Sequence, residues 1–318
     1  MTMIQVRVRS IAWEAEGILS FELVDPQGGR LPAFEAGAHI DVRMPGGVSR
    51  RYSLCNVPGE TRFWRIAVLR TPESRGGSRT MHEKLRPGDL IEVSEPHNFF
   101  ALDETAERTV LVAGGIGITP LLAMVHRLQQ LGRRFELHYC TRNAARTAFA
   151  SELAPLLADG VVRIHHDNGD PKQGLDLAAL LREPRRGTHV YYCGPAGFMN
   201  AAKAATAHWT AGTVHFEYFG AEPLAAPETS GESTMEVRLA KSGRTIPIEP
   251  AQTLLQALRA AGVDCESSCE AGVCGTCLTP YSAGDIEHND LILNDDERRT
   301  EVLVCCARVR QGPVVLDI

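Results

Sequence analysis

The sequence predicts three domains in series: an antiparallel β-barrel, a parallel α/β domain and a small α+β domain. Three observations lead to this prediction. Short alternating segments separated by Gly/Pro turns fill residues 4–100, a continuous apolar run at 109–113 opens a strand–helix rhythm, and six of the nine cysteines lie between 265 and 306. At 318 residues the chain is also too long for one ordinary domain. The expected domains are 1–102, 103–222 and 234–318, with a linker at 223–233.

The composition fits a soluble globular protein, with 44% apolar and 23% charged residues. The chain contains no apolar stretch long enough for a membrane helix and lacks the pattern of a signal peptide. Nine cysteines, an odd number of which six lie between 265 and 306, favour metal ligation in a reducing compartment over disulfides, so a cytoplasmic location is expected. A net charge of −6 without any basic run argues against nucleic-acid binding.

The charge is unevenly distributed. Between residues 234 and 318, 13 acidic residues outnumber 8 basic ones, whereas the preceding part is almost neutral. An acidic small domain could dock on a basic partner surface and gain encounter rate. A solvated acidic face that keeps the domain soluble is the alternative interpretation.

The first domain is predicted from apolar–polar alternation. The alternating segments lie at 4–9, 18–23, 39–42 and 64–69, and turns rich in Gly and Pro separate them. Many short, evenly spaced strands favour a closed barrel.

The second domain begins with the apolar run at 109–113, as expected of a strand buried on both faces. A helix follows, with Thr119 as its predicted cap, Pro120 in its first turn and its end at Gly132. Further strands are predicted at 135–140, 161–165 and 189–193, with helical segments between them.

The third domain follows a Pro/Ala/Glu/Ser-rich linker without apolar periodicity. Residues 235–239 and 245–248 alternate like a hairpin, and Leu254, Leu255 and Leu258 mark one helix. This helix precedes the loop that contains most of the cysteines.

That loop carries the most specific motif of the chain. Cys269, Cys274 and Cys277 have the spacing Cys-x4-Cys-x2-Cys, and Cys305 follows 28 residues later. This spacing is how plant-type ferredoxins hold a [2Fe–2S] cluster. Zinc ligation or simple burial is the alternative, but zinc sites usually come as two Cys-x2–4-Cys knuckles, and here the fourth cysteine has only Cys306 beside it. A cluster moves single electrons, so the rest of the chain should supply them.

Several further motifs suit nucleotide cofactors. Gly115-x-Gly117-x-x-Pro120 follows a strand and opens a helix, where glycines allow a pyrophosphate to approach the exposed N–H groups; a plain tight turn is the alternative. Arg50, Tyr52 and Ser53, expected just after a strand, combine a phosphate-binding cation, a flat phenol and a hydroxyl, although an exposed strand end would look similar.

Residues 74–78 offer a second anion site, built from an arginine, two glycines and hydroxyl groups, or else a flexible turn. Cys193-Gly194-Pro195 ends the last predicted α/β strand, where ligands of parallel sheets bind, and its thiol could face a nicotinamide. In the run at 215–219 an aromatic residue could cover a flavin, although core packing would explain most of these rings.

Together these motifs resemble the ferredoxin–NADP reductase superfamily, and specifically the phthalate dioxygenase reductase group, which includes vanillate demethylase reductases. The resemblance covers essentially the whole chain. It implies a flavin-binding barrel, a nicotinamide domain and a C-terminal β-grasp domain of plant-type ferredoxin fold. The Arg-Gly-Gly-Ser sequence at 75–78 is similar to the phosphate loop of the FMN-binding subgroup, so FMN is favoured over FAD.

The resemblance also implies the residues of each site. The FMN site would comprise Arg50, Tyr52, Ser53, Val68, Arg75, Gly76, Gly77, Ser78, Thr119 and Phe219, with Phe219 stacked beside the ring and Val68 facing it through the barrel. The NAD site would comprise Gly114, Gly115, Gly117, Pro120, Arg142, Asn143, Cys193, Gly194 and Pro195. The cluster ligands would be Cys269, Cys274, Cys277 and Cys305. Cys305 is preferred to Cys306 because Cys305-Cys-Ala-Arg308 matches the Cys-x-Ser-Arg of the group, with alanine replacing serine. Cys265 is interpreted as a packing residue.

The pyridine nucleotide follows the same resemblance. An acidic residue after the second α/β strand would bind the ribose 2′-OH of NADH, but Asn143 stands there, and Arg142 and Arg146 could accept a 2′-phosphate. The group prefers NADH, which is therefore expected.

The implied function is that of a reductase: NADH gives a hydride to FMN, with the nicotinamide positioned near Cys193 and Thr119, and single electrons pass to the [2Fe–2S] cluster. The partner would be a terminal oxygenase with a Rieske centre and mononuclear iron, of the aromatic-ring dioxygenase or O-demethylase type, in an aromatic-degradation system. A monomer is expected. One alternative is a reductase for another acceptor, such as a di-iron monooxygenase, although such reductases usually carry the ferredoxin at the N-terminus. The other is a non-catalytic electron-carrier module.

Overall fold

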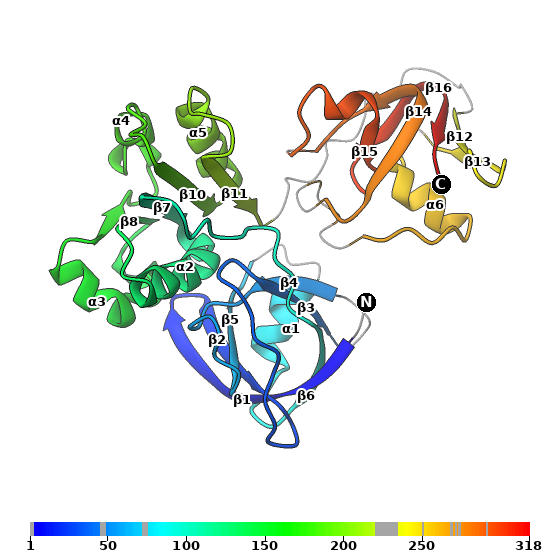
Figure 1. Cartoon of the computed structure of the whole chain (residues 1–318). Coiled ribbons are helices and arrows are strands. Elements are labelled where there is room, and N and C mark those ends of the chain that lie inside the picture. Colours follow the sequence, from blue (N-terminus) through cyan, green and yellow to red (C-terminus); the bar gives the residue numbers. More distant parts are fainter. Residues whose placement is uncertain are drawn as a thin grey trace. The chain divides into compact units, whose positions relative to one another are not determined.

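The computed structural model describes residues 3–44, 49–71, 76–219, 235–249, 251–267, 270, 272, 275–290 and 292–318. The chain divides into two compact units, Met1–Tyr218 and Phe219–Ile318 (Figure 1). The first unit contains an antiparallel sheet and a parallel sheet, and the second contains a mixed sheet, which confirms the predicted fold class. In the described part of the chain, no helix combines the length and the apolar character needed to cross a membrane.

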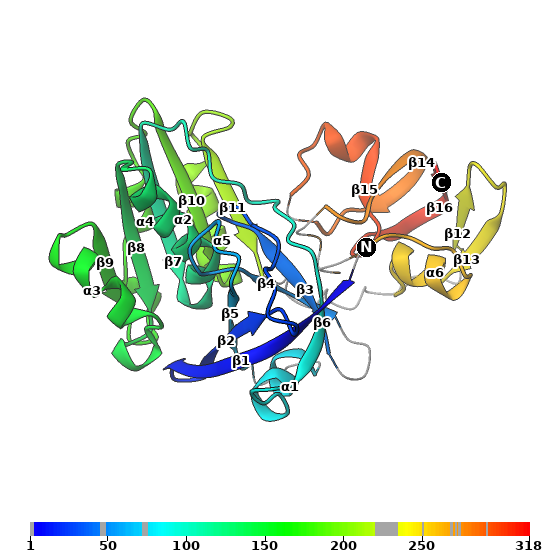
Figure 2. The same cartoon turned by 60° about the horizontal axis from the view of Figure 1, so that its bottom comes forward.

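The barrel is a six-stranded antiparallel sheet of order β4-β3-β6-β1-β2-β5. Its strands are β1 (Met3–Ala15), β2 (Ile18–Val24), β3 (His39–Arg43), β4 (Ser49–Ser53), β5 (Trp64–Leu69) and β6 (Leu90–Ser94). The two ends of this order meet at an antiparallel bridge between Leu54 and Ile66, so the sheet closes as predicted. Trp64, Phe21 and Ile40 are fully buried inside it. Helix α1 (Gly77–Glu83) lies at one end of the barrel (Figure 2).

All four predicted barrel strands are confirmed, and β4 corrects one expectation. Arg50, Tyr52 and Ser53 do not follow a strand but lie within β4, which pairs with β3 so that Ser53 stands opposite His39. The polar side chains of this segment hide its strand character from the alternation pattern. Their placement on a paired strand fixes their direction more firmly than a turn would.

The α/β domain is a five-stranded parallel sheet of order β11-β10-β7-β8-β9. Its strands are β7 (Arg108–Gly114), β8 (Phe135–Thr141), β9 (Val162–His166), β10 (Thr188–Gly194) and β11 (Val214–Tyr218). Its helices are α2 (Ile118–Gln130), α3 (Ala150–Ala158), α4 (Leu177–Leu180) and α5 (Ala196–Thr206), with short 3₁₀ turns at Gly115–Gly117, Ala144–Arg146 and Pro171–Gln173. Figure 1 shows α4 and α5 on the opposite side of this sheet from α2 and α3. The four predicted strands are confirmed.

The start of α2 differs from the prediction. The cap residue is Gly117, and Thr119 lies inside the first turn, where its hydroxyl donates a hydrogen bond to the Ile116 carbonyl at 3.0 Å. The 3₁₀ turn that precedes α2 accounts for the shift, because it places Thr119 beyond the capping position. Pro120 lies in the first turn and Gly132 follows the helix end, as predicted.

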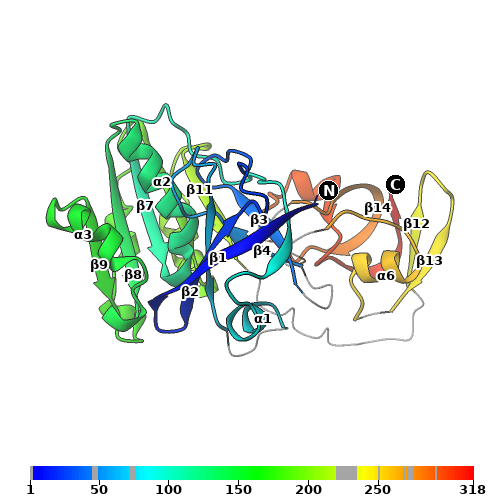
Figure 3. The same cartoon turned by 90° about the horizontal axis from the view of Figure 1, so that it is seen from below.

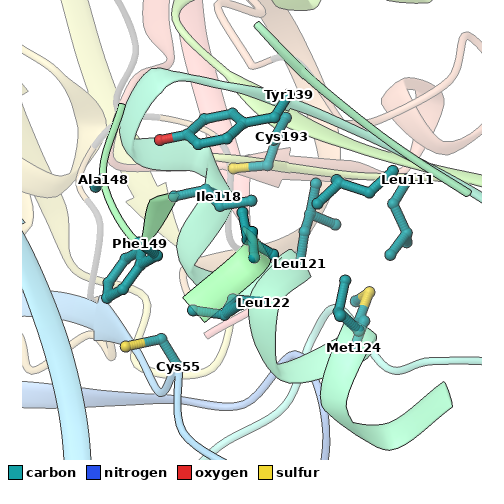
Figure 4. Packing of buried hydrophobic residues seen from close by; sticks show 14 of the residues in the cluster. Cys55, Leu111, Ile118, Leu121, Leu122, Met124, Tyr139, Ala148, Phe149 and Cys193 are labelled. Carbon is teal, nitrogen blue, oxygen red and sulfur yellow. The ribbon is translucent and has the colours of Figure 1, made fainter. Parts of the chain in front are cut away.

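One hydrophobic cluster extends from the α/β domain to the barrel, beside the separate core inside the barrel. The cluster around α2 includes Leu121, Leu122 and Phe149 of the α/β domain together with Cys55 and Ala67 of the barrel (Figure 4). This continuity explains why residues 1–218 form a single compact unit.

The second unit contains a five-stranded mixed sheet of order β13-β12-β16-β14-β15, in which β12 and β16 are parallel. Its elements are β12 (Met235–Leu239), β13 (Thr245–Ile248), α6 (Leu254–Ala260), β14 (Leu278–Glu287), β15 (Glu301–Leu303) and β16 (Arg308–Leu316), with a 3₁₀ turn at Glu297–Arg299. The predicted hairpin and helix are confirmed, and α6 lies beside β12 and β13 (Figure 3). Thr253 and Gln256 form a capping box at the start of α6. The predicted linker lies outside the described residues.

Candidate functional site

Two predicted phosphate-binding segments converge on the barrel. A Cβ atom on Gly77 would lie only 2.8 Å from Cγ of Arg50, so the start of α1 packs directly against the Arg50 side chain of β4. Gly76 has a left-handed φ of 99°, which glycine adopts without strain. Arg75 lies outside the described residues. This cradle of an arginine and two glycines fits the phosphate of FMN.

The other barrel residues of the predicted FMN site differ in accessibility. Tyr52 packs against the barrel core, and burial raises the pKa of its hydroxyl despite the opposing charge of Arg50. Val68 is buried in the same core. The Ser78 hydroxyl lies 3.1 Å from that of Thr71 and 3.3 Å from the Thr71 amide, which ties the start of α1 to the loop after β5.

Ser53 connects the barrel to the α/β domain. Its hydroxyl donates a hydrogen bond of 3.4 Å to Glu217 of β11. In the parallel pairing of β10 with β11, Glu217 stands opposite Cys193. Glu217 was not among the predicted site residues, although a carboxylate in an otherwise aromatic strand end was a visible signal.

The glycine loop after β7 and the Cys-Gly-Pro loop after β10 pack tightly together. A Cβ atom on Gly117 would lie 2.2 Å from the Cys193 carbonyl oxygen, and one on Gly114 would lie 2.9 Å from Cδ of Pro195. Close packing between the two loops therefore requires these glycines. Gly115 differs, because its φ of 52° directs the position of a side chain into open space. Of the motif glycines, Gly115 thus leaves the most room for a ligand.

Cys193 and Thr119 are buried at this junction. Cys193 belongs to the core cluster with Tyr139 and Ile118, and Figure 4 shows its sulfur directed among these side chains. Burial, reinforced by Glu217, raises the pKa of the Cys193 thiol well above its ordinary value. The thiol is therefore neutral. At the ligand-binding end of the sheet it contributes packing volume and no charge.

The loop after β8 contains the residues expected to distinguish the two pyridine nucleotides. Asn143 caps its own 3₁₀ turn by accepting a hydrogen bond from the Arg146 amide at 3.2 Å. The Arg146 guanidinium lies 3.3 Å from Glu16 at the end of β1, whereas Arg142 is exposed. One of the two candidate 2′-phosphate ligands is thus engaged by the barrel.

In the second unit, the described cysteines gather in the core. Cys277 and Cys305 are both buried, and the Val304 amide donates a hydrogen bond to the Cys277 carbonyl at 3.4 Å, which brings their two segments together. Cys269 and Cys274 lie outside the described residues. Cys277, directly before β14, and Cys305, in the turn after β15, lie on adjacent segments, which fits a cluster whose other ligands come from the loop before β14.

The other two described cysteines of this unit, Cys306 and Cys265, are packed against neighbouring residues of the core. The Cys306 thiol donates to the Leu303 carbonyl at 3.4 Å, and a Cβ atom on Gly272 would lie 2.7 Å from its sulfur. Cys265 packs at the edge of the same core.

Phe219, a residue of the predicted FMN site, directly follows β11. The residue is 44% exposed, so its ring is accessible for stacking.

Comparisons with known proteins agree with this organisation. The family model of the oxidoreductase NAD-binding domain matches residues 111–204, and that of the 2Fe-2S iron-sulfur cluster binding domain matches residues 237–310. Phthalate dioxygenase reductase of Burkholderia cepacia is 43% identical, with 99% of this chain and 97% of the relative covered. Vanillate O-demethylase oxidoreductase of Pseudomonas sp. strain HR199 is also 43% identical, with 99% and 100% covered.

A solved structure shows the same arrangement of elements. It is that of phthalate dioxygenase reductase, described as a modular structure for electron transfer from pyridine nucleotides to [2Fe–2S], and it covers 99% of this chain and 98% of its own at 43% identity, with a TM-score of 0.78. These similarities extend over essentially the full length of the chain. The chain therefore belongs to the phthalate dioxygenase reductase family of oxidoreductases, and this relationship indicates FMN, NADH and a [2Fe–2S] cluster as its cofactors.

Proposed function

We propose that the chain is the NADH-dependent reductase component of an oxygenase system and that it delivers single electrons to a separate terminal oxygenase. The observation that supports this most strongly is that one chain contains the barrel, the nucleotide domain and the cluster domain along the full length shared with phthalate dioxygenase reductase. FMN, when bound, accepts two electrons as a hydride and releases them one at a time, which matches a two-electron donor to a one-electron cluster.

One group of barrel residues would hold the phosphate of FMN. Arg50, Arg75, Gly76, Gly77 and Ser78 would bind its phosphate, through a guanidinium fork and the amides at the start of α1.

Other residues would surround the ring of FMN. Tyr52 and Phe219 would lie against its faces, Val68 would contact it from the barrel, and Ser53 and Thr119 would offer hydroxyl groups near its reactive edge.

The nucleotide domain would place NADH at the carboxyl ends of β7 and β10. Gly115 leaves space for the pyrophosphate, while the packing of Gly114, Gly117, Gly194 and Pro195 shapes the loops around it. Pro120 fixes the first turn of α2, and Cys193, whose neutral thiol is buried in the core, would place the end of β10 near the nicotinamide.

The nucleotide preferred would be NADH. Arg146 is paired with Glu16, which leaves Arg142 and Asn143 at the adenosine end without a second free guanidinium. A single arginine holds a 2′-phosphate less well than two, because bidentate and paired contacts supply most of the binding.

Cys269, Cys274, Cys277 and Cys305 would hold the cluster in the second unit. The acceptor would be a Rieske-type oxygenase of the aromatic-ring dioxygenase or O-demethylase class, with the reductase acting as a cytoplasmic monomer. Family relatives named as phthalate 4,5-dioxygenase and vanillate O-demethylase reductases support this class of partner.

Anaerobic titration tests the proposal. The purified protein should be brown, and NADH should bleach both the flavin and the cluster absorbance, with NADPH much less effective. Electron transfer should then be measured to a purified Rieske oxygenase and, for comparison, to cytochrome c. A cluster that is present but not reduced by NADH would support an electron-carrier module instead, and a di-iron monooxygenase as the better acceptor would redirect the choice of partner.

A further inference from the structure

We propose that Arg65, Glu152 and His126 form a clamp that fixes helix α2 of the nucleotide domain against the barrel and thereby sets the distance for hydride transfer. The inference rests on the proposed function, because it concerns the geometry between the nicotinamide and flavin sites. It assigns positioning roles to three residues that lie away from both predicted cofactor sites.

Arg65 reaches from the barrel into the α/β domain. From β5, its Nη2 donates hydrogen bonds to the Cys55 carbonyl at 3.1 Å and to Oε1 of Glu152 at 2.9 Å. The backbone around it is also fixed, because the Arg65 amide donates to Asn56 and its carbonyl accepts from the Cys55 thiol. The guanidinium is therefore held from the barrel side before it meets the carboxylate of α3.

His126 completes the contact from α2. Its Nε2 lies 2.9 Å from the same Oε1 of Glu152, so one carboxylate oxygen bridges β5, α3 and α2. All three side chains are largely buried, with exposed fractions of 18%, 30% and 15% for Arg65, Glu152 and His126. Burial alone would raise the pKa of Glu152, but His126 and Arg65 outweigh it and lower that pKa to about 2. The bridging carboxylate therefore remains ionised in any assay near neutral pH.

Phe149 strengthens the clamp at the start of α3. It occupies the cap position with a left-handed φ of 59°, which is unusual for a bulky residue and persists only where the surroundings enforce it. The Arg65 guanidinium lies 5.1 Å from the centre of its ring, and Figure 4 shows Phe149 and the barrel residue Cys55 on the same side of this core.

The clamp is connected to the nicotinamide end through α2. His126 lies near the C-terminal end of this 13-residue helix, and the Gly115–Gly117 turn lies directly before its first residue. Because a helix moves as a rigid rod, holding His126 against the barrel also holds the glycine loop at a fixed distance from β4. A misplacement of about 1 Å far from the chemistry can lower a rate by on the order of 10²-fold.

A buried charge network is suited to positioning. Replacing such a network by apolar residues often leaves stability unchanged, but removing one partner leaves a buried charge without compensation. Two close contacts on one carboxylate oxygen, one from Arg65 of the barrel and one from His126 of α2, instead favour a single arrangement of the two domains. The pair Glu16–Arg146 also bridges barrel and nucleotide domain, but it is exposed and therefore contributes less rigidity.

The test uses the full-length holoprotein and three clamp variants, Arg65→Met, Glu152→Gln and the double variant R65M/E152L. Arg65→Lys is the conservative variant, and Arg43→Met is the matched control, because Arg43 forms an exposed ion pair with Glu92 inside the barrel. Stopped-flow absorbance measures the rate of flavin reduction and its primary isotope effect with NADH deuterated at the transferred position. Titration with the unreactive 1,4,5,6-tetrahydro-NAD measures nucleotide affinity, and hydrogen exchange reports the amides at 149–153.

Flavin reduction should slow by on the order of 10²-fold in Arg65→Met and R65M/E152L, and its isotope effect should increase in both. In Arg65→Lys the rate should partly recover. FMN content and analogue affinity should stay within about twofold of wild type, as for a geometric defect. Exchange at 149–153 should accelerate in the clamp variants but not in Arg43→Met.

Two results would overturn it. One is wild-type reduction rates in Arg65→Met and Glu152→Gln, and the other is unchanged exchange at 149–153. If Arg65→Met fails to fold, R65M/E152L carries the test, because it buries no unpaired charge. If the wild-type protein itself is not reduced by NADH, the proposed function fails, and the exchange measurement still decides whether the clamp holds the two domains.

Discussion

The Ser53 hydroxyl and the Glu217 carboxylate lie 3.4 Å apart, although 164 residues separate them in the chain. The contact joins β4 of the barrel to the carboxyl end of β11, where Glu217 stands opposite Cys193 in the sheet. The contact therefore lies between the predicted flavin motif and Cys193, the residue expected near the nicotinamide.

We predict that Ser53→Ala leaves the fold intact and slows NADH-dependent flavin reduction by about 10- to 100-fold, since a hydrogen bond to a charged group is worth about 1.5–3 kcal/mol. Stopped-flow reduction and circular dichroism measure the two effects. Ser20→Ala is the control, because Ser20 donates to Glu14 within the barrel at 2.6 Å. Equal rates in both variants would show that the Ser53 contact has no part in the reaction.

Gly117→Ala and Gly197→Ala should have opposite effects on stability. A Cβ atom at 117 would lie 2.2 Å from the Cys193 carbonyl oxygen, so the two loops must separate, and both the melting temperature and nucleotide affinity should fall. At 197, in α5, nothing lies within 4 Å of the added atom, and alanine favours the helix by about 0.5–1 kcal/mol.

Differential scanning calorimetry and titration with 1,4,5,6-tetrahydro-NAD measure these effects. A Gly117→Ala protein as stable and as tightly binding as Gly197→Ala would contradict the interlocked loops seen here.

Local periodicity explains how much of the fold could be predicted. Strands such as β2 and β5 alternate along their own sequence, and the apolar β7 and the glycine turn after it are equally local signals, so the domain order followed from the sequence. The start of α2 could not be predicted to the residue, because a 3₁₀ turn of ordinary composition takes the place of a side-chain cap.

Candidate site residues could be proposed from the sequence only where they form short motifs. The Gly-rich loop, the Cys-Gly-Pro loop and the first three cysteines of the cluster motif each lie within ten residues, and only Cys305 stands apart. Glu217 and the Arg65–Glu152 contact depend on pairing across 164 and 87 residues, which no spacing in the sequence records. Arg50, Tyr52 and Ser53 were predicted as cofactor-binding residues but not as part of a strand. Their polar side chains mask the apolar–polar alternation of β4.

Asn143→Asp should strengthen the preference for NADH over NADPH. Aspartate can keep the cap on the Arg146 amide that Asn143 provides at 3.2 Å, so the loop should retain its conformation. Its carboxylate would accept a hydrogen bond from a ribose 2′-OH and repel a 2′-phosphate. The ratio of kcat/KM for the two nucleotides measures the change, which we expect to be about tenfold. An unchanged ratio would place the adenosine ribose elsewhere.

His215 should make the first unit less stable in mild acid. Its Nε2 lies 3.0 Å from Nδ1 of His189, and its ring stacks on Tyr191 at 4.2 Å. Burial, with the neighbouring His189, lowers the pKa of His215 from 6.5 to about 4, against a smaller opposing effect of Asp103. Between these two values the unfolded chain binds a proton that the folded chain does not, so stability falls as the pH is lowered from 6.5 to 4.

Urea unfolding at several pH values measures this dependence. His215→Asn should flatten the slope between pH 6.5 and 4, whereas His208→Asn, at an exposed position outside this pair, should leave it unchanged. The same slope in His215→Asn as in wild type would assign the acid sensitivity to other groups.

Cys305→Ser and Cys306→Ser should separate the fourth cluster ligand from its neighbour. Cys305 lies on the segment that the Val304 amide ties to the Cys277 carbonyl, whereas the Cys306 thiol donates to the Leu303 carbonyl and packs beneath Gly272. Serine at 306 can keep the hydrogen bond to Leu303, so iron content and visible absorbance should remain. Serine at 305 should abolish or greatly weaken the cluster, because an alkoxide replaces thiolate poorly as an iron ligand. Iron and sulfide analysis with electron paramagnetic resonance after dithionite reduction measures both, and the reverse pattern would assign the ligand to Cys306.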